Sequence, residues 1–191
     1  RGMSSAASDV YKRQIDPHAW NALTNGVIYV ENIAAAMAAA DAGNADAYKA
    51  NAASYIARLR ALHAGAADRF GSLPEDGRTV VTAHDAFGYL ADSYGLNFLA
   101  PVGIDTEAEP SASELAALIA HLKETGAGAL FVENITSPAL IEQISKETGL
   151  KIGGRLFSDA LSERGGPATS YVAMFEHNLG AIMTALEDSG S

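Results

Sequence analysis

The sequence contains no cysteine, few basic residues and no long apolar run. The absence of cysteine excludes disulfides and metal sites built on thiolates. Only 13 lysine and arginine residues stand against 23 aspartate and glutamate residues, a formal net charge of −10. Nucleic-acid binding depends on basic side chains that neutralise phosphates, so this balance argues against a nucleic-acid partner. A membrane-spanning helix needs roughly 20 apolar residues in succession, and no such run is present.

The first 14 residues differ in character from the rest. The stretch SSAASDVYKRQ, residues 4–14, has neither apolar periodicity nor turn chemistry. A transposon adapter used to prepare sequencing libraries can encode this stretch. We therefore interpret residues 1–14 as a non-native, adapter-derived scar and exclude them from fold reasoning. On this interpretation the natural chain starts mid-gene at Ile15, and an N-terminal portion is missing. Without the scar's three basic residues and one acidic residue, 10 basic and 22 acidic residues remain.

Two helices are predicted for residues 15–72. Asp16 is suited to an N-cap and Pro17 to the first helical position, and apolar residues then recur every three or four positions. This pattern predicts a helix of roughly 25 residues, ended by Gly43, and a second helix over residues 44–70. A turn follows at residues 73–77.

From residue 73 to 191 short apolar runs alternate with helical patterns. The alternation predicts an α/β lobe with a mostly parallel, four-stranded sheet covered by helices. The predicted strands are residues 78–83, 97–102, 128–133 and 151–157, and the predicted helices are residues 86–95, 111–126, 137–149 and 169–187.

Two polar residues are predicted at the carboxyl ends of strands, where ligands bind in open parallel sheets. These are His84 and Asp159, and His18 lies in the first turn of the opening helix. Imidazole and carboxylate are ligands that suit Zn²⁺, Mn²⁺ or Fe²⁺. No spacing rule links such distant residues, and a lone histidine or aspartate at a strand end is more often a hydrogen-bonded structural or capping residue.

Five segments together resemble one known family. In order and spacing, the chain is similar to the zinc- and manganese-binding substrate-binding proteins of ABC transporters. The segments are DPHAW (16–20), TAHDAFGYLADSYGL (82–96), GIDTEAEPSASEL (103–115), LFVENITSPALIEQISKETG (130–149) and LFSDALSERGGPATSYVAMFEHN (156–178). The resemblance implies two α/β lobes joined by one long helix, with the metal held between the lobes. Here the helix from Asp16 would be the connector, and residues 73–191 the C-terminal lobe.

The same resemblance implies the metal ligands. The histidine of DPHAW is His18, the histidine of HDAF is His84 and the aspartate of LFSDAL is Asp159. Family members draw a further histidine from the N-terminal lobe, which this chain does not supply, so water is expected to complete the site. Manganese-selective members often have glutamate in place of His84, which favours Zn²⁺ here, with Mn²⁺ or Fe²⁺ as the alternative.

The implied function is capture of the metal and its delivery to an ABC permease, without catalysis. The expected protein is a bacterial monomer in the periplasm or on the outer face of the cytoplasmic membrane. Metal binding should weaken as the pH falls toward the imidazole pKa. Two alternatives stay open: a metal-dependent hydrolase with Glu133 or Glu107 as the base, and an adhesion module.

Further residues carry weaker expectations. Asp85 and Glu133 are candidates for orienting a ligand from behind the metal site. Trp20 is expected in the core. The remaining histidines, His63, His121 and His177, are expected on helix surfaces. The connector helix and the lobe should expose an apolar patch that promotes aggregation.

Overall fold

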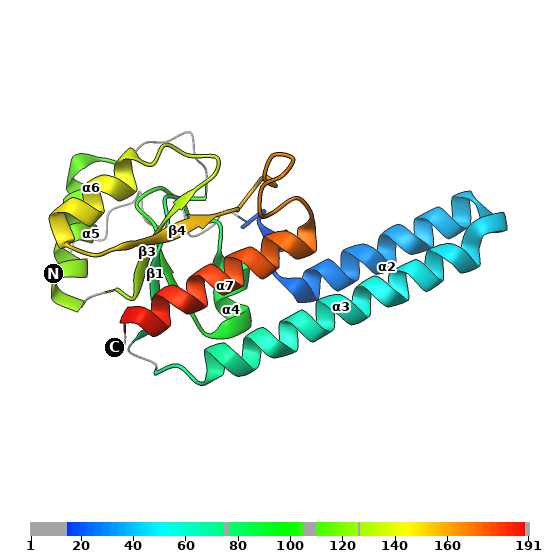
Figure 1. The fold of residues 1–191 in the computed structure, drawn as a ribbon. Coiled ribbons are helices and arrows are strands. Elements are labelled where there is room, and N and C mark those ends of the chain that lie inside the picture. The colour runs from blue at the N-terminus through cyan, green and yellow to red at the C-terminus, as the bar shows by residue number, and fades with distance from the viewer. Residues whose placement is uncertain (1–14, 75–76, 105–109, 126, 190–191) are drawn as a thin grey trace, which may run out of the picture.

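The computed structural model describes residues 15–74, 77–104, 110–125 and 127–189. They form an α/β part from which a pair of helices projects as a long arm (Figure 1). The arm consists of α2 (Leu23–Ala40) and α3 (Ala45–Gly71), which run antiparallel and pack against each other. The projecting element is thus a helical hairpin.

The sheet has four parallel strands, as the sequence predicts. These are β1 (Thr79–Val81), β2 (Asn97–Leu99), β3 (Ala129–Glu133) and β4 (Ile152–Leu156). Their order in the sheet is β2-β1-β3-β4. Val80 is opposite Phe98 on one side and Ala129 on the other. The pairing of β3 with β4 is irregular between Leu130 and Phe131.

Successive strand residues enter two separate apolar clusters, because side chains alternate between the faces of a strand. Val80 and Phe131 pack into the larger cluster, on the face covered by α3, α4 (Gly88–Tyr94) and α7 (Tyr171–Ser189). Val81 and Leu130 pack into the smaller cluster, against α5 (Ala112–Thr125) and α6 (Ala139–Thr148). The sheet is therefore covered on both faces (Figure 1).

The strand order creates a switch point between β1 and β3. From β1 the chain passes through α4 to β2 at one edge, then returns through α5 to β3 on the other side of β1. The connections on the two sides of this gap thus run on opposite faces of the sheet. The carboxyl ends of the strands beside such a gap are the usual place for a ligand in an open parallel sheet.

The helix predicted to begin at Asp16 begins later. Ala19–Asn21 form a single 3₁₀ turn, and α2 starts only at Leu23. Ala22 between them has an extended backbone, with φ of −123° and ψ of 128°. Asp16 does not cap an α-helix, because its Oδ1 accepts the N–H of His18 at 2.9 Å. This correction moves His18 out of the first turn of a helix and into an irregular segment.

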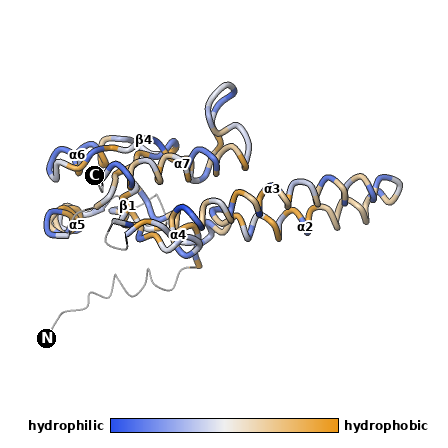
Figure 2. The backbone as a smooth tube through the Cα atoms, turned by 60° about the horizontal axis from the view of Figure 1, so that its bottom comes forward, coloured by the Kyte–Doolittle hydropathy of each residue, from blue (hydrophilic) through white to orange (hydrophobic). Residues whose placement is uncertain are grey.

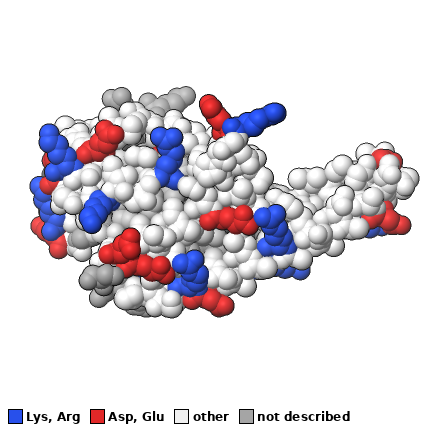
Figure 3. Space-filling view, in the orientation of Figure 1, with Lys and Arg blue, Asp and Glu red and all other residues white. Residues whose placement is uncertain are grey.

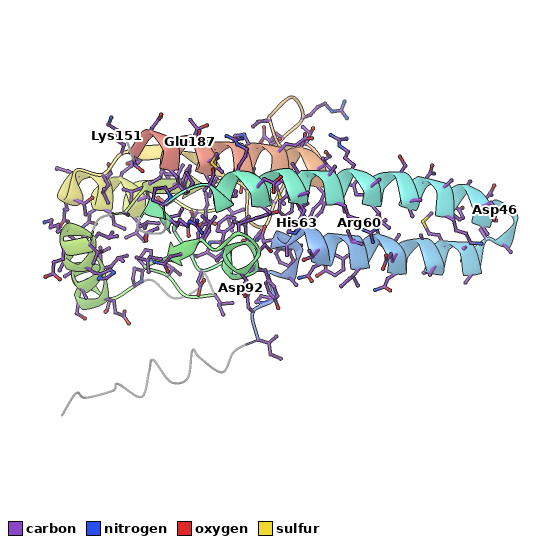
Figure 4. All side chains as sticks on the ribbon, turned by 90° about the horizontal axis from the view of Figure 1, so that it is seen from below. Asp46, Arg60, His63, Asp92, Lys151 and Glu187 are labelled. Atoms are coloured by element: carbon purple, nitrogen blue, oxygen red, sulfur yellow. The ribbon has the colours of Figure 1, made fainter. Side chains whose placement is uncertain are left out.

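The far end of the arm also differs slightly from the prediction. The helix ends at Ala40, and a 3₁₀ turn at Ala42–Asn44 leads into α3, whereas the sequence suggested an end at Gly43. Asp46 lies at this tip, the point of the arm farthest from the sheet (Figure 4).

One side of the arm is apolar and exposed. Figure 2 shows hydrophobic residues along both helices, and Figure 3 shows few charged side chains on the visible side of the arm. On α2 the large exposed apolar residues are Ile28, Tyr29, Ile33 and Met37. The predicted apolar patch is thus present, on α2. None of the helices in the described ranges combines the length and hydropathy needed to cross a membrane.

Candidate metal centre

Four residues converge at the carboxyl ends of the strands. His84 follows β1, Glu133 is the last residue of β3 and Asp159 follows β4. The fourth, His18, precedes the 3₁₀ turn at Ala19–Asn21. β1 and β3 flank the switch point of the sheet, and β4 is the next strand. The topology therefore gathers three of the four residues at one edge.

His84 is fixed at both ring nitrogens. Its Nδ1 lies 2.8 Å from Oε2 of Glu133, and its Nε2 lies 3.1 Å from Oδ2 of Asp159. The other oxygen of Glu133 accepts the backbone N–H groups of Ala83 and His84, at 2.9 and 3.0 Å. His84 is 1% exposed and the Glu133 side chain 0%. A carboxylate so deeply buried needs partners of this kind, and it fixes the ring with Nε2 toward Asp159.

His18 repeats this arrangement with a different carboxylate. Its Nδ1 lies 2.8 Å from Oδ1 of Asp16, and its Nε2 lies 3.4 Å from Oδ1 of Asp159. A carboxylate behind a histidine fixes which nitrogen is free to bind a metal. Both histidines therefore direct Nε2 toward the same aspartate.

The two imidazoles and the carboxylate form a compact set of potential ligand atoms. Their ligand atoms all lie within 4.8 Å of one another, and the ring centroids of His18 and His84 are 5.5 Å apart. Both histidines are buried, whereas the side chain of Asp159 is 24% exposed. Asp159 thus forms the side of the cluster that solvent reaches. Two imidazoles and one carboxylate are a donor set found in zinc sites.

The charges of the site shift two pKa values in opposite directions. Burial alone lowers the pKa of His84. The hydrogen bonds to Asp159 and Glu133 and the charges of both carboxylates outweigh it, and they raise the pKa of His84 from 6.5 to about 9. Burial raises the pKa of Asp159, but the bond to His84 and the charges of His84 and His18 lower it overall. Without metal, His84 is therefore held protonated between the two carboxylates.

The two residues predicted to orient a ligand, Glu133 and Asp85, differ in their contacts. Glu133 lies against the His84 ring, whereas Asp85 is exposed. Within the described residues, no hydrogen bond joins the Asp85 carboxylate to either histidine ring. The pKa of Asp85 is raised by burial and by the negative charge of Asp16. The role of Asp85 in orienting a ligand stays a prediction.

Sequence reasoning missed the contribution of Asp16. It interpreted Asp16 as a helix cap, while the structure places its carboxylate on the His18 ring. The available signal was the Asp-Pro-His spacing, since an aspartate commonly accepts the N–H two residues ahead. Trp20, expected in the core, is half-buried with its ring against that of His18, centroids 5.4 Å apart.

The other candidates lie outside this cluster. His63 on α3 contacts the hydroxyl of Tyr94 at 3.2 Å, and His177 on α7 contacts the carbonyl of Arg155. His121 is exposed on α5. Glu107, the alternative base of a hydrolase, lies outside the described residues.

Comparison with known proteins gives concordant matches. Residues 2–185 match the family model described as zinc-uptake complex component A, periplasmic. This range includes most of residues 1–14, whose adapter origin stays a prediction. The chain is 35% identical over 175 residues to the iron ABC transporter substrate-binding lipoprotein MtsA of Streptococcus pyogenes serotype M1. That alignment covers 92% of this chain and 56% of the relative.

Solved structures agree with the sequence matches. The periplasmic zinc-binding protein TroA from Treponema pallidum superposes with a TM-score of 0.86 at 29% identity, covering 92% of this chain and 65% of that one. The manganese-bound periplasmic metal-binding protein from Candidatus Liberibacter asiaticus gives a TM-score of 0.80 at 31% identity, covering 90% and 63%.

These relatives are described with three different metals, and the chain spans a little over half the length of the curated relative named above. The family match includes the strands of the sheet, the arm and the cluster of His18, His84 and Asp159. This chain therefore belongs to the ZnuA family of metal ABC transporter substrate-binding proteins.

Proposed function

We propose that this chain captures a divalent transition metal ion, Zn²⁺ in the first place. The ligands are Nε2 of His18, Nε2 of His84 and the carboxylate of Asp159. One observation carries the proposal: these atoms lie within 4.8 Å of one another, although their residues are far apart in sequence. Since a carboxylate engages Nδ1 of each ring, the two Nε2 atoms are the nitrogens available to a metal.

The ligand types favour zinc. Imidazole nitrogen is a softer donor than carboxylate oxygen and suits Zn²⁺, whereas Mn²⁺ prefers oxygen. The alternative cargo is Mn²⁺ or Fe²⁺, which related proteins carry in their descriptions. Water, or a residue outside the three ligands, completes the coordination, because zinc sites are usually four-coordinate.

Delivery to a permease is the second part of the proposal, and the family supports it. Relatives are described as substrate-binding lipoproteins of ABC transporters, and the family model as periplasmic. On this basis the complete protein works outside the cytoplasmic membrane, as a monomer that docks on an ABC permease and releases its ion there.

A hydrolase at the same site is the less favoured candidate. Its base would have to approach a metal-bound water, but Glu133 is fully buried and engaged with His84 and with two backbone N–H groups. A carboxylate with these partners holds a ligand in place and is not available to take a proton from substrate. We infer that the family's function is binding rather than turnover.

A chelator-competition titration tests the proposal. The chain is titrated with Zn²⁺ and with Mn²⁺, together with His84→Ala and the control His121→Ala, which removes an exposed histidine from α5. The expected result is one tightly bound zinc that excess manganese does not displace, lost in His84→Ala and kept in His121→Ala. Equal zinc binding by both variants contradicts the proposal. Preference for manganese supports the alternative cargo, and hydrolysis of a test ester supports the hydrolase.

A further inference from the structure

Two consecutive side chains next to His18 bond to the segments that carry the other two ligands. The indole Nε1 of Trp20 donates to the carbonyl of Ser158 at 2.8 Å, and Ser158 directly precedes Asp159. The amide Nδ2 of Asn21 donates to the carbonyl of Ala86 at 3.0 Å, two residues beyond His84. We infer that Trp20 and Asn21 are positioning residues that hold the three ligand-bearing segments in one fixed arrangement.

The segment that carries His18 is held by side-chain contacts rather than by regular secondary structure. Residues 15–18 belong to no helix or strand, the 3₁₀ turn has three residues, and Ala22 is extended. No strand ladder or α-helix therefore fixes His18 relative to the sheet. Asn21 is 0% exposed, so its bond to Ala86 is made in the interior, where a lost partner is costly.

The long helix α7 also bonds to the segments that carry His18 and Asp159. The hydroxyl of Tyr171, at its start, donates to the carbonyl of Trp20 at 2.7 Å. Asn178, two turns further on, accepts the N–H of Phe157 at 3.0 Å and donates to its carbonyl at 2.8 Å. Asn178 thus pairs with the backbone just before Ser158 and Asp159 as a neighbouring strand would. Trp20 is held through its backbone by α7 and through its ring by the end of β4.

The consequence for the metal follows from preorganisation. This inference rests on the proposed ligands His18, His84 and Asp159. If their segments moved independently, binding would have to order them and affinity would fall. Residues that hold ligands in place typically contribute a 10- to 100-fold factor in metal affinity. Trp20 and Asn21 therefore contribute to affinity without touching the ion.

The first test measures zinc affinity by chelator competition on the whole chain. Trp20→Phe keeps an aromatic ring but removes the indole N–H, and Asn21→Leu keeps the branched shape but removes the amide donor. The control Tyr94→Phe removes a buried hydroxyl that contacts His63 on the arm. Each positioning variant should lose about 10- to 100-fold in zinc affinity, while Tyr94→Phe stays within about twofold of the unmodified chain. Folded positioning variants with unchanged affinity overturn the inference.

The second test needs no metal. Hydrogen exchange followed by mass spectrometry is compared for peptides that cover residues 16–22, 83–87 and 156–160. Trp20→Phe should speed exchange in the first and third peptides, and Asn21→Leu in the first and second. Tyr94→Phe should leave all three unchanged. A uniform increase along the chain would mean general destabilisation and would overturn the inference.

The two proposals fail in different ways. If His84→Ala binds zinc as tightly as the unmodified chain, the ligand assignment is wrong, while the exchange pattern still decides whether Trp20 and Asn21 connect the segments. If His84→Ala loses zinc but the positioning variants match Tyr94→Phe in both tests, the ligands stand and the positioning role is overturned.

Discussion

The carboxylate of Glu133 lies 2.8 Å from Nδ1 of His84, with both side chains shielded from solvent. Asp16 stands in the same relation to His18, at the same distance. The two histidines thus have the same arrangement: a carboxylate contacts Nδ1 of each ring, and Nε2 of each ring faces Asp159. The difference is burial, since Glu133 is fully buried whereas the Asp16 side chain is 26% exposed.

This pairing predicts that Glu133→Gln weakens zinc binding by about 10- to 100-fold. The amide keeps the size of the side chain but loses the charge that supports His84 as a ligand. Asp16→Asn should act in the same direction through His18. Glu142→Gln is the matched control, because Glu142 is an exposed carboxylate on α6. Chelator competition measures all three, and a loss in Glu142→Gln equal to that in Glu133→Gln would refute the distinction.

The stability of the metal-free chain should fall as the pH rises. The folded pKa of His84, about 9, lies above its ordinary value of 6.5. Protonated His84 therefore stabilises the fold fully below about pH 6.5, and this contribution is lost as the pH rises through about 9. The difference is on the order of 3 kcal/mol. Urea unfolding with a chelator present, at several pH values across this window, measures it.

The matched variant for the pH experiment is His84→Gln, because the glutamine side chain does not titrate. Its free energy of unfolding should vary less over the same window. A wild-type chain as stable at the upper end as at the lower end would show that the two carboxylates do not hold a proton on His84.

Gly26→Ala should destabilise the chain. A Cβ at residue 26 would lie 2.6 Å from the hydroxyl oxygen of Tyr171 and 2.9 Å from its ring. Tyr171 would have to move, and its bond to the carbonyl of Trp20 would weaken. Overpacking of this kind costs about 1–3 kcal/mol. The control is Gly65→Ala on α3, which meets nothing within 4 Å and should stabilise its helix by up to about 1 kcal/mol. Thermal unfolding distinguishes the two, and equal shifts would contradict the packing argument.

The apolar side of α2 should make the chain self-associate. Ile33 is 58% exposed in the middle of this surface. Ile33→Lys should lower the apparent mass in light scattering and reduce binding of a hydrophobic dye, with stability changed by no more than about 0.5 kcal/mol. Leu161→Lys alters a similarly exposed residue beyond β4 and should have little effect. An equal response to both substitutions would mean that association is not specific to α2.

Local patterns predicted most of the secondary structure, and the exceptions have physical causes. Ser111 and Glu114 form a reciprocal cap before α5, a local feature because the two residues that make it are three positions apart. Asp16 carries an equally good capping signal, yet its carboxylate bonds to His18 instead. The Asp16 carboxylate contacts both the backbone N–H and the ring Nδ1 of His18, so it does not serve as a helix cap.

The sequence by itself determined the four parallel strands, the helices between them and the position of His84 and Asp159 after β1 and β4. These features depend on apolar periodicity and on caps, which act over a few residues. The family resemblance already implied that His18, His84 and Asp159 share one site, and Glu133 was a candidate for orienting a ligand. Only the tertiary structure decided that Glu133 and Asp16 contact Nδ1 of the two histidines, and that Trp20 and Asn21 bond to the segments that carry the other ligands. The contact of Glu133 with the backbone of His84 spans 49 residues, and that of Trp20 with Ser158 spans 138. No local pattern encodes them, because they form only when the sheet places the strand ends side by side.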